Sequence, residues 1–292
     1  MSLPSELIYA ILDELWLKTR PEVSPLNTRK IFYNAVLHCS STAKPFRAYL
    51  LPKILSHIEC KSRRRLKGLS EILTENASLI PLIKSFHIHQ ITYTSIKEDV
   101  WITDDQNIPF ILDILRQGSH LEALTIEVTG FESQFWSFLD HTIQDSIYAL
   151  VQSRRLKFVR FAGVAHIAGD LLDALYRDVE SVQLELDTVS QFRAPPPSNR
   201  RASPVDVVQH TRCEKLDLGV LSIPSLPHFC NTIESRHSRL EHLVLRHHKP
   251  LFVQNQSFAP LFHALRASPS IRRLSIIHDA SEPPSPFYSP KG

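Results

Sequence analysis

Glycine is scarce in this chain, which contains only seven among its 292 residues. No two glycines have the spacing of a phosphate-binding loop such as G-x-G-x-x-G, so the sequence predicts no nucleotide site of that kind. The four cysteines include no C-x-x-C pair, which argues against both a disulfide framework and a structural zinc site. The net formal charge is only +3, which excludes a strongly basic nucleic-acid-binding protein.

Long apolar runs are also missing. No run approaches the roughly 18 residues of a membrane-spanning helix, and Glu6 interrupts any signal-peptide core at the N-terminus. We therefore expect a cytoplasmic or nuclear protein with no membrane or nucleic-acid partner. The basic run at residues 61–67 has two interpretations, a nuclear localisation signal or the solvated first turn of a helix. The second is favoured, because charge runs are usually solvated faces.

The sequence does contain a repeated pattern, apolar-x-x-apolar-x-apolar. The last two apolar positions of each copy alternate with neighbours that are mostly polar, which is the period of a strand with one buried face. The seven copies are Ile83-Phe86-Ile88, Leu121-Leu124-Ile126, Leu156-Val159-Phe161, Val179-Val182-Leu184, Cys213-Leu216-Leu218, Leu240-Leu243-Leu245 and Ile271-Leu274-Ile276. We expect all of these positions to be buried.

The segments between the copies carry apolar residues at helical spacing. Such stripes lie within residues 108–115, 143–151, 171–175, 226–233 and 258–265. Alternation of strand and helix is typical of parallel strands joined by helical crossovers. The fold class is therefore α/β with one parallel sheet.

The repeated pattern resembles the Leu-x-x-Leu-x-Leu core of leucine-rich repeats, although the Asn that follows this core in the family is absent from every copy. The resemblance implies a leucine-rich-repeat-like solenoid over residues 51–280. A closed or doubly wound α/β domain is the competing architecture. Sheets of that kind are buried on both faces, whereas these strands have one polar face, which favours the solenoid.

The first 50 residues have a different pattern, that of a small helical domain. Residues 3–15 form an amphipathic helix, residues 29–37 a second, and residues 39–51 a third segment. A strand is expected over residues 53–60, followed by a helix at about residues 65–76.

The opening Leu-Pro-x-Glu-Leu-Ile, at residues 3–8, resembles the start of an F-box. The order of elements is similar to that of fungal F-box proteins with irregular leucine-rich repeats. The resemblance implies that residues 1–50 bind the Skp-type adaptor of a cullin–RING ubiquitin ligase. The implied adaptor contacts are Leu3, Pro4, Leu7, Ile8, Ile11, Leu12 and Phe46, the last standing where many members have Trp. The alternative is that these helices only cap the solenoid.

Two stretches are too polar and Pro-rich to pack in a core. We expect a disordered insertion at about residues 190–206 and a disordered tail at residues 281–292, in which Ser203, Ser285 and Ser289 each precede Pro. A phosphorylation site and a plain solvated linker are both possible interpretations of these serines.

No catalytic constellation stands out, and we expect neither an enzyme nor a cofactor. His87 and His89 point to the same side of a strand and could share a metal ion, but no acidic residue or Cys stands at an obvious third position. We therefore interpret them as surface or hydrogen-bonded histidines and predict no metal site. Asp104 and Asp105 are expected to begin the helix that ends near Gln117.

These observations predict a protein-interaction adaptor, the substrate-recognition subunit of a Skp–cullin–F-box ubiquitin ligase. The alternative is a stand-alone leucine-rich-repeat-like scaffold. The expected target-binding surface is the concave face of the sheet, where the positions between the buried ones point away from the core. Lys215, His242, Arg246 and Arg273 are expected to receive an acidic or phosphorylated segment of an unknown target protein.

Overall fold

A computed structural model describes the conformation of most of the chain. The described residues are 4–19, 26–92, 100–118, 120–130, 134–165, 167–185, 212–219, 240–247, 263, 265–266 and 270–278. The expected insertion at residues 190–206, the tail at residues 281–292 and the stripe at residues 226–233 lie outside them. The stripe at residues 258–265 lies largely outside them as well.

Three helices form the N-terminal part of the molecule: α1 (Ser5–Leu17), α2 (Leu26–Thr42) and α3 (Lys44–Ser56). They enclose a small apolar cluster of their own, built on Leu12, Val36 and Leu50. Asp13 on α1 accepts a hydrogen bond from the Tyr49 hydroxyl (2.8 Å) and pairs with Lys53, which ties α1 to α3.

The strand expected from residue 53 begins only at residue 57, because α3 continues through Ser56. Leu50 and Ile54, one helical turn apart, both pack on the apolar cluster of the three helices. Burial of this stripe outweighs the β-like character of the segment, so the short strand β1 (His57–Cys60) follows directly.

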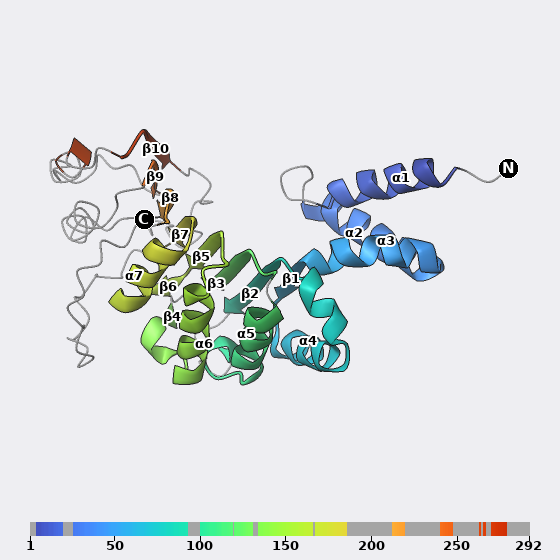
Figure 1. Ribbon diagram of the computed structural model, residues 1–292, viewed down its shortest axis with the longest axis horizontal. Helices are drawn as coiled ribbons and strands as arrows, with labels where there is room; N and C mark the ends of the chain where they lie inside the picture. The colour runs from blue at the N-terminus through green and yellow to red at the C-terminus, as the bar shows by residue number, and fades with distance from the viewer. Residues whose placement is uncertain are drawn as a thin grey trace, which may run out of the picture.

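Eight parallel strands form the main sheet, and they lie side by side in chain order (Figure 1). After β1 the sheet contains β2 (Ser85–Thr92), β3 (Ala123–Gly130), β5 (Phe158–Ala162), β7 (Ser181–Glu185), β8 (Lys215–Gly219), β9 (His242–His247) and β10 (Arg273–His278). A separate pair of short parallel strands joins β4 (Gln134–Phe135) to β6 (Val164–Ala165). The prediction of an α/β protein with a parallel sheet is confirmed.

The repeated pattern sets the register of the sheet. Each copy lies opposite the next, so that Phe86 faces Leu124, Leu124 faces Val159, and the row continues in step to β10. All three positions of the first six copies are buried, as expected. The seventh copy departs from the prediction: Leu274 is 38% and Ile276 59% exposed. They lie on β10, which among the described strands is the last of the sheet and pairs with β9 alone.

Four α-helices alternate with the first strands and line one side of the sheet (Figure 1). They are α4 (Arg63–Glu75), α5 (Asn107–Gly118), α6 (His141–Gln152) and α7 (Gly169–Asp178), accompanied by the 3₁₀ turns η1 (Ala77–Leu82), η3 (Trp101–Thr103) and η4 (Trp136–Phe138). The apolar stripes of α5, α6 and α7 join the buried strand positions in one continuous core. Within the described residues, no helix has the length and apolarity needed to cross a membrane.

The backbone passes very close to itself after β5, where Gly163 has a φ of 66°. A Cβ atom at this position would lie 1.9 Å from the carbonyl oxygen of Val128. Both the left-handed backbone and the contact exclude a side chain here.

We therefore expect Gly163→Ala to lower the free energy of unfolding by at least about 1–3 kcal/mol, the cost of a strained backbone, with the steric contact adding to it. The matched control is Gly68→Ala on α4, where a Cβ would meet nothing within 4 Å. That change should stabilise the protein by about 0.5–1 kcal/mol, because alanine favours a helix over glycine. Urea denaturation of both variants measures the difference, and equal stabilities would contradict this account of the turn.

Two of the four cysteines belong to the core of the sheet. Cys60 and Cys213 are buried, and desolvation raises the pKa of Cys60 to about 11 and that of Cys213 to about 12. Cys39 on α2 is only partly buried, and Cys230 lies outside the described residues. The thiolate is the reactive form of cysteine, so the two core thiols are expected to be inert.

Iodoacetamide at pH 8 should thus modify Cys39 of the native Cys230→Ser variant well before Cys60 and Cys213. All three should react once the protein is unfolded in urea. Peptide mass spectrometry at timed intervals gives the order of labelling, and early modification of Cys213 in native protein would be inconsistent with its place in the core.

Candidate functional site

Two surfaces contain the residues that the sequence singles out, and the first is the outer side of α1. Leu7 and Ile11 lie one turn apart and are 49% and 47% exposed. Pro4 is exposed as well, and its carbonyl begins the helix by accepting from the amides of Leu7 and Ile8 (3.2 Å each). These residues form an apolar strip of large side chains that no other described helix covers.

The remaining implied adaptor contacts have different environments. Leu12 is 3% exposed and belongs to the apolar cluster between the three helices. Ile8 and Phe46 pack against this cluster but remain partly exposed. Leu3 lies outside the described residues. The sequence therefore located the helix, but its i, i+1, i+4 spacing did not distinguish the side that faces α2 and α3 from the side that faces solvent.

The second surface is the side of the sheet opposite the buried rows, which we call the polar face. At its N-terminal end, a row of ionisable side chains crosses five strands. Its members in order are Glu59, His87, Glu127, Arg160 and Glu185. His87 Nε2 lies 3.1 Å from Glu127 Oε2, and Arg160 bridges Glu127 (3.4 Å) and Glu185 (2.9 Å). The contact with His87 and the nearby Arg160 cation hold the pKa of the Glu127 carboxyl below its ordinary value.

Glu59 gives this end of the polar face a third potential metal ligand, which the sequence analysis did not find. Its Oε1 lies 3.4 Å from His87 Nδ1 and 3.5 Å from His89 Nδ1. The signal was present: Leu55, Ile58 and Cys60 are a further copy of the repeated pattern. Recognising it would have put Glu59 level with His87, as the observed pairing of β1 with β2 does.

The C-terminal end of the polar face carries the four residues expected to bind an acidic target, and two of them are already engaged. Arg246 donates two hydrogen bonds of 2.9 Å to the carboxylate of Asp217, which is buried. His242 contacts the Ser275 hydroxyl at 3.1 Å, and desolvation together with Arg273 and Lys215 lowers its pKa, which disfavours its charged form. Lys215 and Arg273 are exposed and share a row with His242.

The Arg246–Asp217 pair is structural, because a buried carboxylate needs its cation. Arg246→Ala should lower the free energy of unfolding by roughly 1–3 kcal/mol, the cost of leaving a buried polar group without its partner. Arg273→Ala, which removes an exposed guanidinium from the same face, should stay within about 0.5 kcal/mol of the wild type. Chemical denaturation of the two variants measures both values. If Arg246→Ala destabilises the protein as little as Arg273→Ala, the Asp217 carboxylate does not depend on Arg246.

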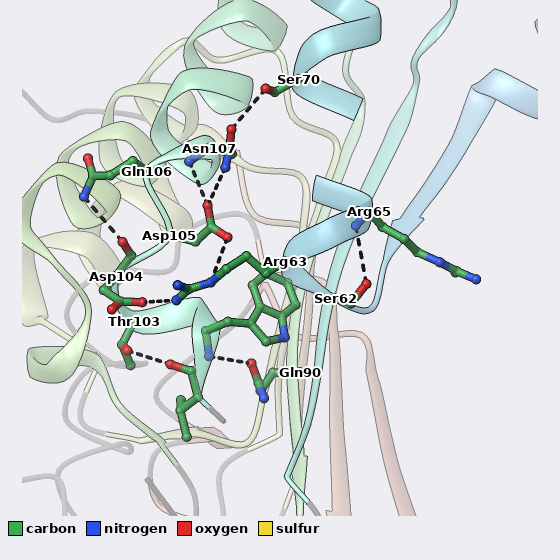
Figure 2. A network of polar contacts seen from close by, with 12 residues as sticks. Ser62, Arg63, Arg65, Ser70, Gln90, Thr103, Asp104, Asp105, Gln106 and Asn107 are labelled. Atoms are coloured by element: carbon green, nitrogen blue, oxygen red, sulfur yellow. Dashed lines mark hydrogen bonds and ion pairs between the residues drawn. The ribbon is translucent and has the colours of Figure 1, made fainter. Parts of the chain in front are cut away.

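A further polar network lies away from both surfaces and holds α4 against the start of α5 (Figure 2). Arg63, in the exposed first turn of α4, pairs with Asp104 (2.6 Å) and with the buried Asp105 (3.5 Å). Asp105 accepts hydrogen bonds from the backbone and side chain of Asn107 (2.9 and 2.8 Å). The helix begins at Asn107, and of the two aspartates expected to begin it, only Asp105 accepts from the amides of its first turn, those of Asn107 and Ile108. Asp104 instead ends the preceding turn η3. The network serves packing.

The comparisons with known proteins identify no family for this chain: neither a scan against protein-family models nor a search of curated proteins finds a match. Glu59, His87 and His89 are the one group of potential metal ligands within the described part of the chain.

Proposed function

We propose that this chain is the substrate-recognition subunit of a Skp–cullin–F-box ubiquitin ligase. Its N-terminal helices would bind the adaptor, and its leucine-rich-repeat-like sheet would hold a target protein. The observation that carries the proposal is the exposure of Leu7 and Ile11 on a helix whose opposite side is buried. The catalytic gain would come from bringing the target close to the ubiquitin-transfer machinery, with no reacting side chain in this protein.

A solenoid is the architecture that agrees best with the order of the strands. A doubly wound sheet reverses its strand order at a switch point and carries helices on both faces. Here each strand of the main sheet lies beside the one before it, and the described α-helices between β1 and β7 line a single side (Figure 1). The polar side of the sheet is thereby available to a protein partner, as in solenoids that bind along such a surface.

The arrangement of the three helices favours an adaptor site over a cap. A cap would shield the end of the sheet core with its own apolar residues. The cluster around Leu12, Val36 and Leu50 is instead separate from the core of the sheet, and the exposed strip of α1 faces away from that cluster. The stand-alone scaffold remains the alternative, and adaptor binding distinguishes the two.

Target recognition would fall to the C-terminal end of the polar face. Among the described residues, the N-terminal end offers no free cation for such a segment, since Arg160 is shared by Glu127 and Glu185. Lys215 and Arg273 are exposed at the other end, beside His242, whose pKa is lowered. This distribution supports an acidic or phosphorylated target segment, held by these two cations, with Arg246 positioned by Asp217.

The test is binding of a purified Skp-type adaptor to the full chain, measured by calorimetry. The double variant Leu7→Asp with Ile11→Asp should weaken binding by roughly 100-fold or more, because two apolar side chains contribute about 1.5–3 kcal/mol each when fully buried. The melting temperature should change little, since both side chains are exposed in the free protein.

The matched control is Ile72→Asp on α4. Ile72 is 48% exposed, much like Leu7 and Ile11, but lies outside the three N-terminal helices. This variant should bind the adaptor as the wild type does. A double variant that loses stability in step with binding would support the capping role. Absence of wild-type binding at micromolar concentrations would show that the helices are not an F-box.

A further inference from the structure

We propose that Glu59, His87 and His89 form a binding site for a divalent transition-metal ion of the zinc class. The site lies at the N-terminal end of the polar face and joins β1 to β2, directly after the three helices. It does not depend on the proposed ligase function, because it concerns other residues and another ligand.

The distances from Glu59 to the two histidines fit the ligand spacing of a tetrahedral ion. Glu59 Oε1 lies 3.4 Å from His87 Nδ1 and 3.5 Å from His89 Nδ1, and the three ligand atoms lie within 4.8 Å of one another. Zinc binds imidazole nitrogen at about 2.0–2.1 Å and carboxylate oxygen at about 2.0–2.2 Å, which places two tetrahedral ligands roughly 3.3–3.5 Å apart. Small side-chain rotations would bring all three atoms to an ion between them.

The strand holds the two imidazoles in the orientation that the site requires. Alternate residues of a strand point to the same side, and the rings of His87 and His89 are stacked with their planes only 4° apart and their centroids 5.4 Å apart. Both rings turn Nδ1 toward Glu59. The Nδ1 atom of His89 is buried and makes no hydrogen bond, so a polar atom directed into the site is left unsatisfied.

The outer nitrogens of the same rings face polar groups of the neighbouring strand, and His87 Nε2, like His89 Nδ1, is buried and makes no hydrogen bond. His87 Nε2 faces the Glu127 carboxylate at 3.1 Å, and His89 Nε2 lies 3.2 Å from the Thr129 hydroxyl. A carboxylate at this position orients the ring and increases its basicity as a ligand. The second oxygen of Glu59 is held by Lys61 at 3.0 Å, which leaves Oε1 directed at the histidines.

The ligand set selects the kind of ion. Two imidazoles and one carboxylate suit zinc and its neighbours among the transition metals, whereas magnesium and calcium prefer oxygen ligands throughout. Three protein ligands leave a fourth position for water or for a donor group of a bound partner. The half-buried histidines and the exposed Glu59 place that position on the polar face, in reach of solvent.

The experiment uses the full chain, treated with a chelator, dialysed and titrated calorimetrically with zinc chloride. The wild type should bind one ion per chain, and magnesium chloride should give no signal. Glu59→Gln and His89→Gln should each weaken zinc binding by at least tenfold, since changes to outer partners alone typically cost 10–100-fold. Circular dichroism confirms that each variant is folded.

His120→Gln and His141→Gln are the matched controls, because both histidines are exposed and lie outside the site. They should bind zinc as the wild type does, and zinc should raise the melting temperature of the wild type and the controls only. Zinc binding that is lost equally in the controls would mean adsorption at surface histidines and would overturn the proposal. Absence of zinc binding to the wild type would also overturn the proposal. If His89→Gln fails to fold, the zinc affinity of Glu59→Gln still tests it.

Discussion

The register of the parallel sheet is the constraint on which the rest of this structure depends. Because side chains alternate between the two faces of a strand, a slip of one residue would move every apolar side chain of a strand to the polar face. One buried row of side chains crosses the strands from Phe86 through Leu124 and Val159. A second buried row begins at Ile88 and crosses the same strands in parallel. Together with the stripes of α5, α6 and α7, these rows make a single core.

The same register determines which polar side chains meet. Glu59 lies level with His87, and His87 level with Thr125, so that Glu127 and Arg160 reach their partners from neighbouring strands along the diagonal. One end of the polar face thus pairs its charges internally, and the other presents Lys215 and Arg273. The proposed metal site uses the first end, and the proposed acidic partner would bind the second.

The N-terminal helices are stabilised by an apolar cluster of their own, separate from the core of the sheet. Their cluster of Leu12, Val36 and Leu50 is enclosed by three helices, which is why the outer side of α1 can remain apolar and exposed without weakening the sheet. The connection between the two parts is α3, which runs directly into β1. Any partner bound to α1 would therefore sit at the same end of the molecule as Glu59, His87 and His89.

Local periodicity in the sequence was enough to predict the strands from β2 to β10 of the main sheet and the stripes of α5, α6 and α7, because each depends on neighbours within a few residues. The preference of acidic residues for a helix N-terminus placed Asp105 at the start of α5. The sequence also contains the copy at Leu55, Ile58 and Cys60, which the sequence analysis missed and whose first residue lies in α3. Contacts between strands were beyond its reach: the engagement of Arg246 by Asp217 and the approach of Glu59 to His87 arise between residues 29 and 28 positions apart in the chain. Only the packed sheet brings such residues together, since pairing across strands is set by tertiary register rather than by local pattern.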